Sequence, residues 1–268
     1  MLKQRVLTAV VLVGGFLGAL FFSPAPLWLV LIAAIAAVAA HEWGALIDLS
    51  STLRKAYAFA TAVAAAVLGY LAMGEPCQST LLLYGLSVLF WGLLVPLWFR
   101  ARWKSGPRIG ALVGWLVLLP TAVALVDLRG IDPLLLLAAM VLVWIADVAA
   151  YFTGRAFGRV KLAPSISPGK TREGAYGAMF GVFVCGMAFF ALVGDAADGL
   201  SWAVMAVLLP VFTLLSIEGD LFESLLKRQA GVKDSGTLLP GHGGVLDRID
   251  SLTSTMPLVG LIALWAAR

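Results

Sequence analysis

The sequence predicts an all-α membrane protein, a polytopic helical bundle with about nine transmembrane helices. Hydrophobic residues make up 61% of the 268 residues and charged residues only 13%, whereas soluble proteins carry roughly 45–50% and about 25%. So few charges leave too little polar surface to cover a water-soluble domain of this length. The hydrophobicity also excludes a disordered chain, and two cysteines are too few for a disulfide scaffold.

Nine apolar segments are long enough to cross a hydrocarbon core, which takes about 20 helical residues. Their unbroken apolar runs differ from the alternating pattern of a membrane β-barrel. The predicted spans are residues 6–22, 27–47, 56–74, 79–99, 110–126, 133–153, 174–194, 200–219 and 251–267. We interpret the first as a retained span and not as a signal peptide, because Pro24 and Pro26 disrupt the cleavage pattern. The chain 1–268 is then one integral membrane domain, with about five spans in 1–130 and the rest in 131–268.

The basic residues predict the orientation of the bundle, because Lys and Arg concentrate in cytoplasmic loops. With nine spans, 17 of the 19 basic residues fall on the side that holds the N-terminus. We therefore expect the N-terminus in the cytoplasm and the C-terminus outside. This asymmetry accounts for the net charge of +4 without nucleic acid, since the chain has no basic module rich in aromatic residues. The opposite side holds Glu75, Asp127, Arg129, Asp132, Asp195, Asp198 and Arg268.

The two longest polar stretches, 154–173 and 220–250, are both predicted to face the cytoplasm, so a functional site is expected there. The second begins as a helical continuation of the eighth span. One face of that helix carries Asp220, Glu223, Ser224 and Lys227, which are spaced at i, i+3, i+4 and i+7.

Two more carboxylates, Asp247 and Asp250, lie at the start of the ninth span. Together with Asp220 they can gather a hard cation such as Mg²⁺, which takes one or two carboxylates plus phosphate and water oxygens. Gly243 and Gly244 precede them, where the N–H groups of a helix N-terminus would suit a phosphate. The combination is typical of phosphoryl or nucleotidyl transfer, although a charged connector alone needs no function. Basic residues that would neutralise phosphate oxygens are Lys227, Arg228, Lys233 and Arg248.

The sixth span carries Asp147, Tyr151 and Arg155 on one face, which indicates either a substrate contact or an interhelical ion pair or hydrogen bond. His242, between two glycines, has an equally open interpretation, as a ligand contact or part of a turn. His41 and Glu42 at the end of the second span are most simply a buried hydrogen-bonding couple.

The segment 167–174 contains Gly-Lys-Thr but is not a P-loop, because Pro164 stands where a glycine is required and no strand is expected before it. We predict a tight turn that presents Lys170 and Arg172. Ser167 or Thr171 would cap the following helix.

At these residues the sequence resembles the phosphatidate cytidylyltransferases, or CDP-diacylglycerol synthases. Their signature is Ser-x-aliphatic-Lys-Arg-x4-Lys-Asp-x-small-x2-aliphatic-Pro-x-His-Gly-Gly-aliphatic-x-Asp-Arg-aliphatic-Asp, and residues 224–250 match every fixed position. The similarity extends to Asp147–Arg155 and to the 167–174 segment, where Arg172 replaces a residue that is often aromatic.

The resemblance implies the reaction of CTP with phosphatidate to give CDP-diacylglycerol and pyrophosphate, dependent on Mg²⁺, at the cytoplasmic face of a bacterial inner membrane. It also implies Asp220 and Asp247 as metal ligands, a monovalent cation such as K⁺, and a homodimer. No general base is needed, because a phosphomonoester with a second pKa of about 6 is largely dianionic at pH 7.

The resulting hypothesis assigns roles to two groups of residues. Metal ligands are Asp220, Asp247 and Asp250, and the catalytic group further includes Lys227, Arg228, Lys233, Asp234, His242 and Arg248. The substrate-binding group comprises Asp147, Tyr151, Arg155, Ser167, Lys170, Thr171, Arg172, Glu223, Ser224, Gly243 and Gly244.

Three rival functions differ in the sequence features that they require. A CDP-alcohol phosphotransferase is disfavoured, because the sole Asp-Gly pair, Asp198-Gly199, lacks the rest of that family's motif. A CTP-dependent polyprenol kinase is closer in chemistry. A transporter would place ionisable residues near the membrane midplane, and here they gather at one side.

Overall fold

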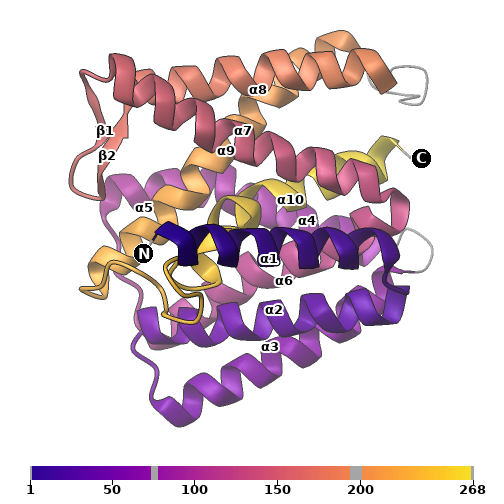
Figure 1. The fold of residues 1–268 in the computed structure, drawn as a ribbon. Helices are drawn as coiled ribbons and strands as arrows, with labels where there is room; N and C mark the ends of the chain where they lie inside the picture. Colours follow the sequence, from indigo (N-terminus) through magenta and orange to yellow (C-terminus); the bar gives the residue numbers. More distant parts are fainter. Residues whose placement is uncertain (1, 74–77, 194–200, 267–268) are drawn as a thin grey trace.

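A computed structural model describes residues 2–73, 78–193 and 201–266. Within these ranges the chain forms a bundle of long helices and one small β-hairpin (Figure 1). The helices are α1 (Leu2–Phe22), α2 (Ala25–Leu46), α3 (Ser51–Ala72), α4 (Gln78–Leu89), α5 (Val95–Ala101), α6 (Pro107–Ile131), α7 (Pro133–Phe157), α8 (Arg172–Val193), α9 (Trp202–Gln229) and α10 (Leu246–Ala266). A π-helical turn, η1 (Phe90–Leu94), joins α4 and α5 into one continuous helix.

The predicted helical membrane bundle is confirmed, with a helix at each of the nine predicted spans. By length and composition, eight helices in the described ranges can cross a membrane, while α1 contributes the shorter apolar stretch Val10–Phe22. The charged positions Glu75, Asp195, Asp198 and Arg268, and Gly199, lie outside the described residues.

The bundle has one polar end that gathers distant parts of the chain. The start of α1, the hairpin and the segment between α9 and α10 lie at this end, and α10 finishes at the other (Figure 1). Which end faces the cytoplasm stays a prediction from the basic residues.

The prediction for the 167–174 segment was partly wrong. Strand β2 (Ser167–Thr171) pairs antiparallel with β1 (Lys161–Ala163), so a strand does precede the Gly-Lys-Thr sequence. Strands this short, with Pro168 and Gly169 inside one of them, carry no alternating hydrophobic signal. The capping prediction is confirmed for Thr171, whose Oγ1 accepts the Gly174 N–H at 3.1 Å ahead of α8.

Small residues let α9 and α10 approach closely. A Cβ added to Gly219 would lie 2.6 Å from the Asp250 carbonyl oxygen, so only glycine fits at this crossing. The Ser251 hydroxyl donates to the Ser216 carbonyl at 3.0 Å across the same contact. Small and hydroxyl residues are the usual means of close helix packing in membranes. The crossing brings Asp220 and Asp250 to neighbouring positions on two helices.

An aromatic cluster packs α9 against the earlier helices. Its centre is Phe222, a fully buried residue next to Glu223 in the chain. Five aromatic rings lie with centroids 5.4–6.4 Å from the Phe222 ring, those of Trp43, Phe90, Trp91, Trp98 and Phe99.

Pro257 in α10 is accommodated by donors from two other helices. Because proline has no N–H, the Thr253 carbonyl one turn earlier loses its helical partner. Trp91 Nε1 and Thr121 Oγ1 donate to this oxygen at 3.1 and 3.2 Å. In hydrocarbon an unpaired carbonyl would be costly, so these contacts stabilise α10 against the N-terminal helices.

Candidate functional site

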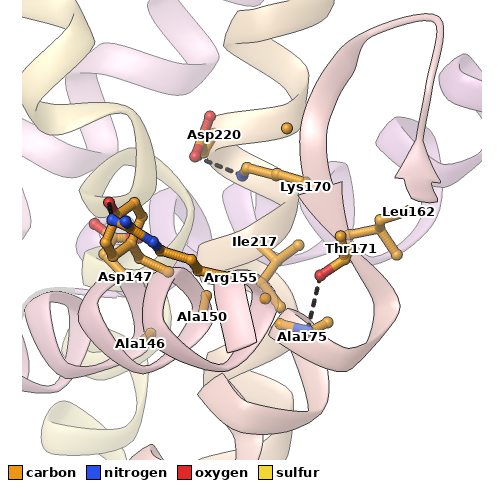
Figure 2. Close-up of a pocket in the computed structure, with 14 residues that line it drawn as sticks. Ala146, Asp147, Ala150, Arg155, Leu162, Lys170, Thr171, Ala175, Ile217 and Asp220 are labelled. Atoms are coloured by element: carbon orange, nitrogen blue, oxygen red, sulfur yellow. Dashed lines mark hydrogen bonds and ion pairs between the residues drawn. The ribbon is translucent and has the colours of Figure 1, made fainter. Parts of the chain in front are cut away.

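A cavity of about 620 Å³ opens at the polar end of the bundle, between α7, the hairpin, α8 and α9 (Figure 2). Small residues such as Ala146, Ala150 and Gly174 form part of its wall. The polar side chains that line it are Asp147, Tyr151, Arg155, Lys170, Thr171 and Asp220. The structure therefore places the polar face of α7 and the hairpin residue Lys170 around the same space as Asp220 of α9.

One ion pair and two hydrogen bonds connect polar side chains at the cavity. Lys170 reaches from β2 to Asp220, with Nζ 2.5 Å from Oδ2 (Figure 2). The Ser224 hydroxyl donates to the other Asp220 oxygen at 3.3 Å. Arg155 Nη1 donates to the Tyr151 hydroxyl at 3.0 Å, one turn back on α7. The polar face of α7 thus hydrogen-bonds within its own helix and is presented to the cavity.

Carboxylates from three helices converge beside the cavity. Asp147 of α7, Asp220 of α9 and Asp250 of α10 interact electrostatically with one another, and Asp250 also with Glu223. Glu223 is 3% exposed, and its Oε1 is buried without a hydrogen-bond partner. Yet in the described part of the chain no three Asp, Glu, His or Cys side chains are already arranged as a metal-ligand set.

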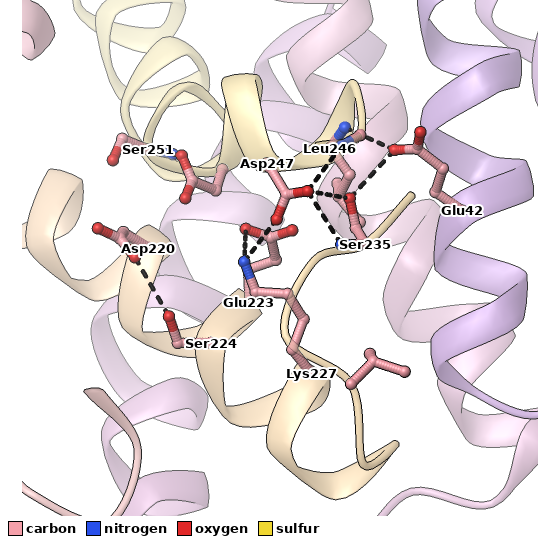
Figure 3. Close-up of polar contacts among 12 residues, drawn as sticks. Glu42, Asp220, Glu223, Ser224, Lys227, Ser235, Leu246, Asp247 and Ser251 are labelled. Carbon is pink, nitrogen blue, oxygen red and sulfur yellow. Dashed lines mark hydrogen bonds and ion pairs between the residues drawn. The ribbon is translucent and has the colours of Figure 1, made fainter. Parts of the chain in front are cut away.

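A second polar network connects α9 to α10 (Figure 3). Lys227 Nζ lies 2.6 Å from Asp247 Oδ1 and 3.1 Å from Glu223 Oε2. All three side chains are nearly excluded from solvent, with exposed fractions of 11, 5 and 4%. A single ammonium therefore compensates two buried carboxylates, as a buried charge requires.

The second oxygen of Asp247 organises the glycine loop. Oδ2 accepts the Gly244 N–H at 2.8 Å and the Ser235 N–H and hydroxyl at 2.9 Å each. Gly243 has φ of +79°, and a Cβ there would lie 2.7 Å from this oxygen, so the tight turn needs glycine. The Gly244 N–H, which we predicted would suit a phosphate, donates to Asp247 in this structure.

The other predicted site residues lie around these two networks. Arg228 Nε donates to the Ile166 carbonyl at 3.3 Å and Nη1 to the Val232 carbonyl at 3.2 Å, which ties α9 to the hairpin turn and the following loop. Ser167 is half-buried in β2, and the half-buried His242 has Nδ1 3.4 Å from the Pro240 carbonyl oxygen. Exposed at the polar end are Arg172, Lys233, Asp234 and Arg248, the last of which interacts electrostatically with Asp147.

One residue of the network was missed by sequence reasoning. Glu42, at the end of α2, is 6% exposed and its carboxylate accepts hydrogen bonds from Ser235, Val245 and Leu246. The predicted couple with His41 is wrong, because His41 is exposed. A glutamate within an otherwise apolar span was the available signal, since such residues are costly and tend to be functional.

The arrangement suits the handling of phosphate anions together with a cation. Cationic side chains and carboxylates alternate around a cavity at the end of a membrane bundle, and most are fixed by ion pairs or hydrogen bonds. Preorganised charges of this kind neutralise developing negative charge without reorganisation.

Comparison with known proteins agrees with the geometry. Residues 3–265 match the model of the cytidylyltransferase family. The chain is 40% identical to a phosphatidate cytidylyltransferase of Pseudomonas aeruginosa, over 100% of this chain and 98% of that protein. It is 37% identical to the Haemophilus influenzae protein of that name, over 96% of each, and 36% identical to that of Brucella suis, over 97% and 92%. The chain therefore belongs to the cytidylyltransferase family and is a nucleotidyltransferase enzyme of multi-pass membrane architecture.

Proposed function

We propose that the protein is a CTP:phosphatidate cytidylyltransferase, which forms CDP-diacylglycerol and pyrophosphate for phospholipid synthesis. The observation that carries this proposal is the folding of the 224–250 motif. Asp250 and Arg248 of this motif interact electrostatically with Asp147, which lines the cavity at the polar end of the bundle together with Lys170 and Asp220. Relatives that span the chain are named for this activity, which supports the same substrates here.

In the proposed reaction a phosphate oxygen of phosphatidate attacks the α-phosphorus of CTP. The new oxygen–phosphorus bond forms as the bond from the α-phosphorus to the α,β-bridging oxygen breaks, and pyrophosphate departs with that electron pair. The nucleophile is largely dianionic at pH 7, because the second pKa of a phosphomonoester is about 6. No side chain has to remove a proton. The protein's task is to bring two anions together and hold them in line.

Asp220, Asp247 and Asp250 are the residues we propose to hold Mg²⁺. The donor set fits a hard cation in its chemistry, since all the groups are carboxylates. When bound, Mg²⁺ would supply charge neutralisation for the phosphate oxygens. Two proposed ligands are paired with lysines, Asp220 with Lys170 and Asp247 with Lys227, so cation and lysines compete for the same oxygens.

The basic residues divide into two roles in this proposal. Lys170, Arg172, Lys233 and Arg248 are close to the cavity or exposed at its end of the bundle, and we assign them to the CTP and lipid phosphates. Lys227 and Arg228 are engaged by protein carboxylates and carbonyls, so we assign them to holding α9, α10 and the hairpin in place.

The charge distribution supports a site at the cytoplasmic face of a bacterial inner membrane, because the polar end of the bundle carries the basic loops. A monovalent cation such as K⁺ and a homodimer stay predictions from the family resemblance.

The proposal is tested by counting pyrophosphate released from CTP by the purified protein in detergent, with and without phosphatidate. We expect release that requires both phosphatidate and Mg²⁺. Release of CDP with a polyprenol acceptor would instead identify a lipid kinase, and the absence of any nucleotide turnover would refute the proposal.

A further inference from the structure

We propose that Glu42 is a positioning residue for the reaction, acting from the N-terminal half of the chain on the loop that carries Asp247. This inference rests on the proposed function for its kinetic part and on the structure alone for its conformational part. No motif assigns a role to Glu42, which lies about 200 positions before the loop that it contacts.

The carboxylate of Glu42 closes over the start of α10 (Figure 3). Oε1 accepts the Val245 N–H at 3.1 Å, and Oε2 accepts the Leu246 N–H at 2.8 Å. The first N–H groups of a helix have no partner within that helix and carry its positive dipole end. The Glu42 carboxylate of α2 therefore caps the N-terminus of α10, a role that a residue next to the helix in the sequence usually has.

Glu42 also shares a donor with Asp247. The Ser235 hydroxyl lies 3.2 Å from Glu42 Oε2 and 2.9 Å from Asp247 Oδ2. Consecutive N–H groups divide between the two carboxylates, with Gly244 bound to Asp247 and Val245 and Leu246 bound to Glu42. The position of Asp247 is therefore defined by α2 as well as by α9.

Burial and close backbone contacts hold the Glu42 carboxylate in this position. The residue is 6% exposed, and none of the ion pairs among the described residues includes it. Its charge is compensated by neutral donors and the helix dipole. Burying a charge without an ion pair costs free energy that an apolar residue at this position would not cost. A Cβ at Gly236 or Gly244 would collide with its carboxylate, so the loop backbone approaches it as closely as glycine allows.

The variant Glu42→Gln tests the inference because glutamine has nearly the same shape as glutamate but replaces one of the two accepting oxygens with an NH2 donor. Its amide nitrogen must face at least one of the N–H or O–H donors that the carboxylate accepts. Since partners of this kind typically contribute 10–100-fold to a site, we expect kcat to fall about 10–100-fold while KM for CTP stays within about threefold. His41→Gln, an exposed change on the adjacent residue, is the matched control and should leave kcat unchanged.

Hydrogen–deuterium exchange of the substrate-free protein provides the readout that does not depend on activity. We expect faster exchange in peptides covering 235–246 of Glu42→Gln, with α3 and α6 unchanged. The double variant with Ser235→Ala should lose little more activity than the worse single variant, because both act on one loop. Wild-type kcat in Glu42→Gln, or faster exchange spread over the whole bundle, would overturn the inference. If wild-type protein forms no pyrophosphate, the proposed function fails, and the exchange comparison alone decides whether Glu42 holds the loop.

Discussion

Lys227 and Asp247 lie on different helices, and a 2.6 Å ion pair joins their side chains at the polar end of the bundle. The same ammonium holds Glu223 at 3.1 Å. This three-residue cluster locks α9 to α10 beside the cavity that Lys170 and Asp220 enter. The proposed chemistry depends on this ion-pair cluster, because the cluster fixes the carboxylates of α9 and α10 relative to each other.

Lys227→Met is expected to destabilise the protein by about 3–5 kcal/mol, since it leaves two buried carboxylates without a countercharge. Unfolding in detergent, followed by circular dichroism, measures the change. The exposed Lys233→Met is the control and should stay within about 0.5 kcal/mol of wild type. Equal stability of the two variants would contradict the structural role of Lys227.

Asp247→Asn is expected to lower pyrophosphate formation about 10–100-fold or more, because it removes the charge that Lys227 and three other donors hold in place. Steady-state turnover of folded protein is the measurement. Asp48→Asn is a matched control, since Asp48 is exposed and asparagine tolerates its φ of +58°. Near wild-type turnover in Asp247→Asn would remove Asp247 from the site.

Lys170→Met is expected to raise KM for CTP about tenfold, because charge-assisted contacts to phosphate contribute about 1.5–3 kcal/mol. Initial rates across a CTP series test this, and the exposed Lys104→Met on another loop serves as the control. If both variants kept the wild-type KM, Lys170 would have no part in nucleotide binding.

Lys233→Met is expected to weaken CTP binding by a smaller factor, because an exposed charge contributes only about 0.2–1 kcal/mol. The loss should shrink as salt is added, since exposed charges are screened. CTP affinity and rate that both match wild type at low salt would refute the screening role assigned to Lys233.

Phe222→Ala is expected to cost about 3–5 kcal/mol of stability, because it opens a cavity in the middle of the aromatic cluster. Thermal unfolding in detergent reports the loss. The control Phe180→Ala also removes a phenyl ring, but Phe180 is 72% exposed, so the stability should change little. A similar effect at both positions would show that the cluster does not anchor α9.

The spans were predictable because each is an apolar run of the length that a membrane demands. The continuation of α9 through Lys227 followed from polar residues spaced at helical intervals. Asp247 and Asp250 were placed at the start of α10 for the same reason. Fold class and the grouping of the motif residues thus follow from local patterns.

Contacts between distant segments were not predictable. Nothing local to Glu42 shows that its partners are Ser235 and the start of α10. The β-hairpin was missed because its strands are short and lack alternation. The engagement of the Gly244 N–H by Asp247 depends on the positive φ of Gly243, which a sequence pattern cannot specify.

The central claim is that the cytidylyl group of CTP passes to phosphatidate in this protein. Parallel reactions with CTP labelled at the α- or the γ-phosphorus, followed by extraction of the lipid, test it most directly. The account predicts that α-label enters the lipid fraction, that γ-label leaves as pyrophosphate, and that a chelator of divalent cations stops both. Transfer of γ-label to lipid, or of neither label, would contradict it.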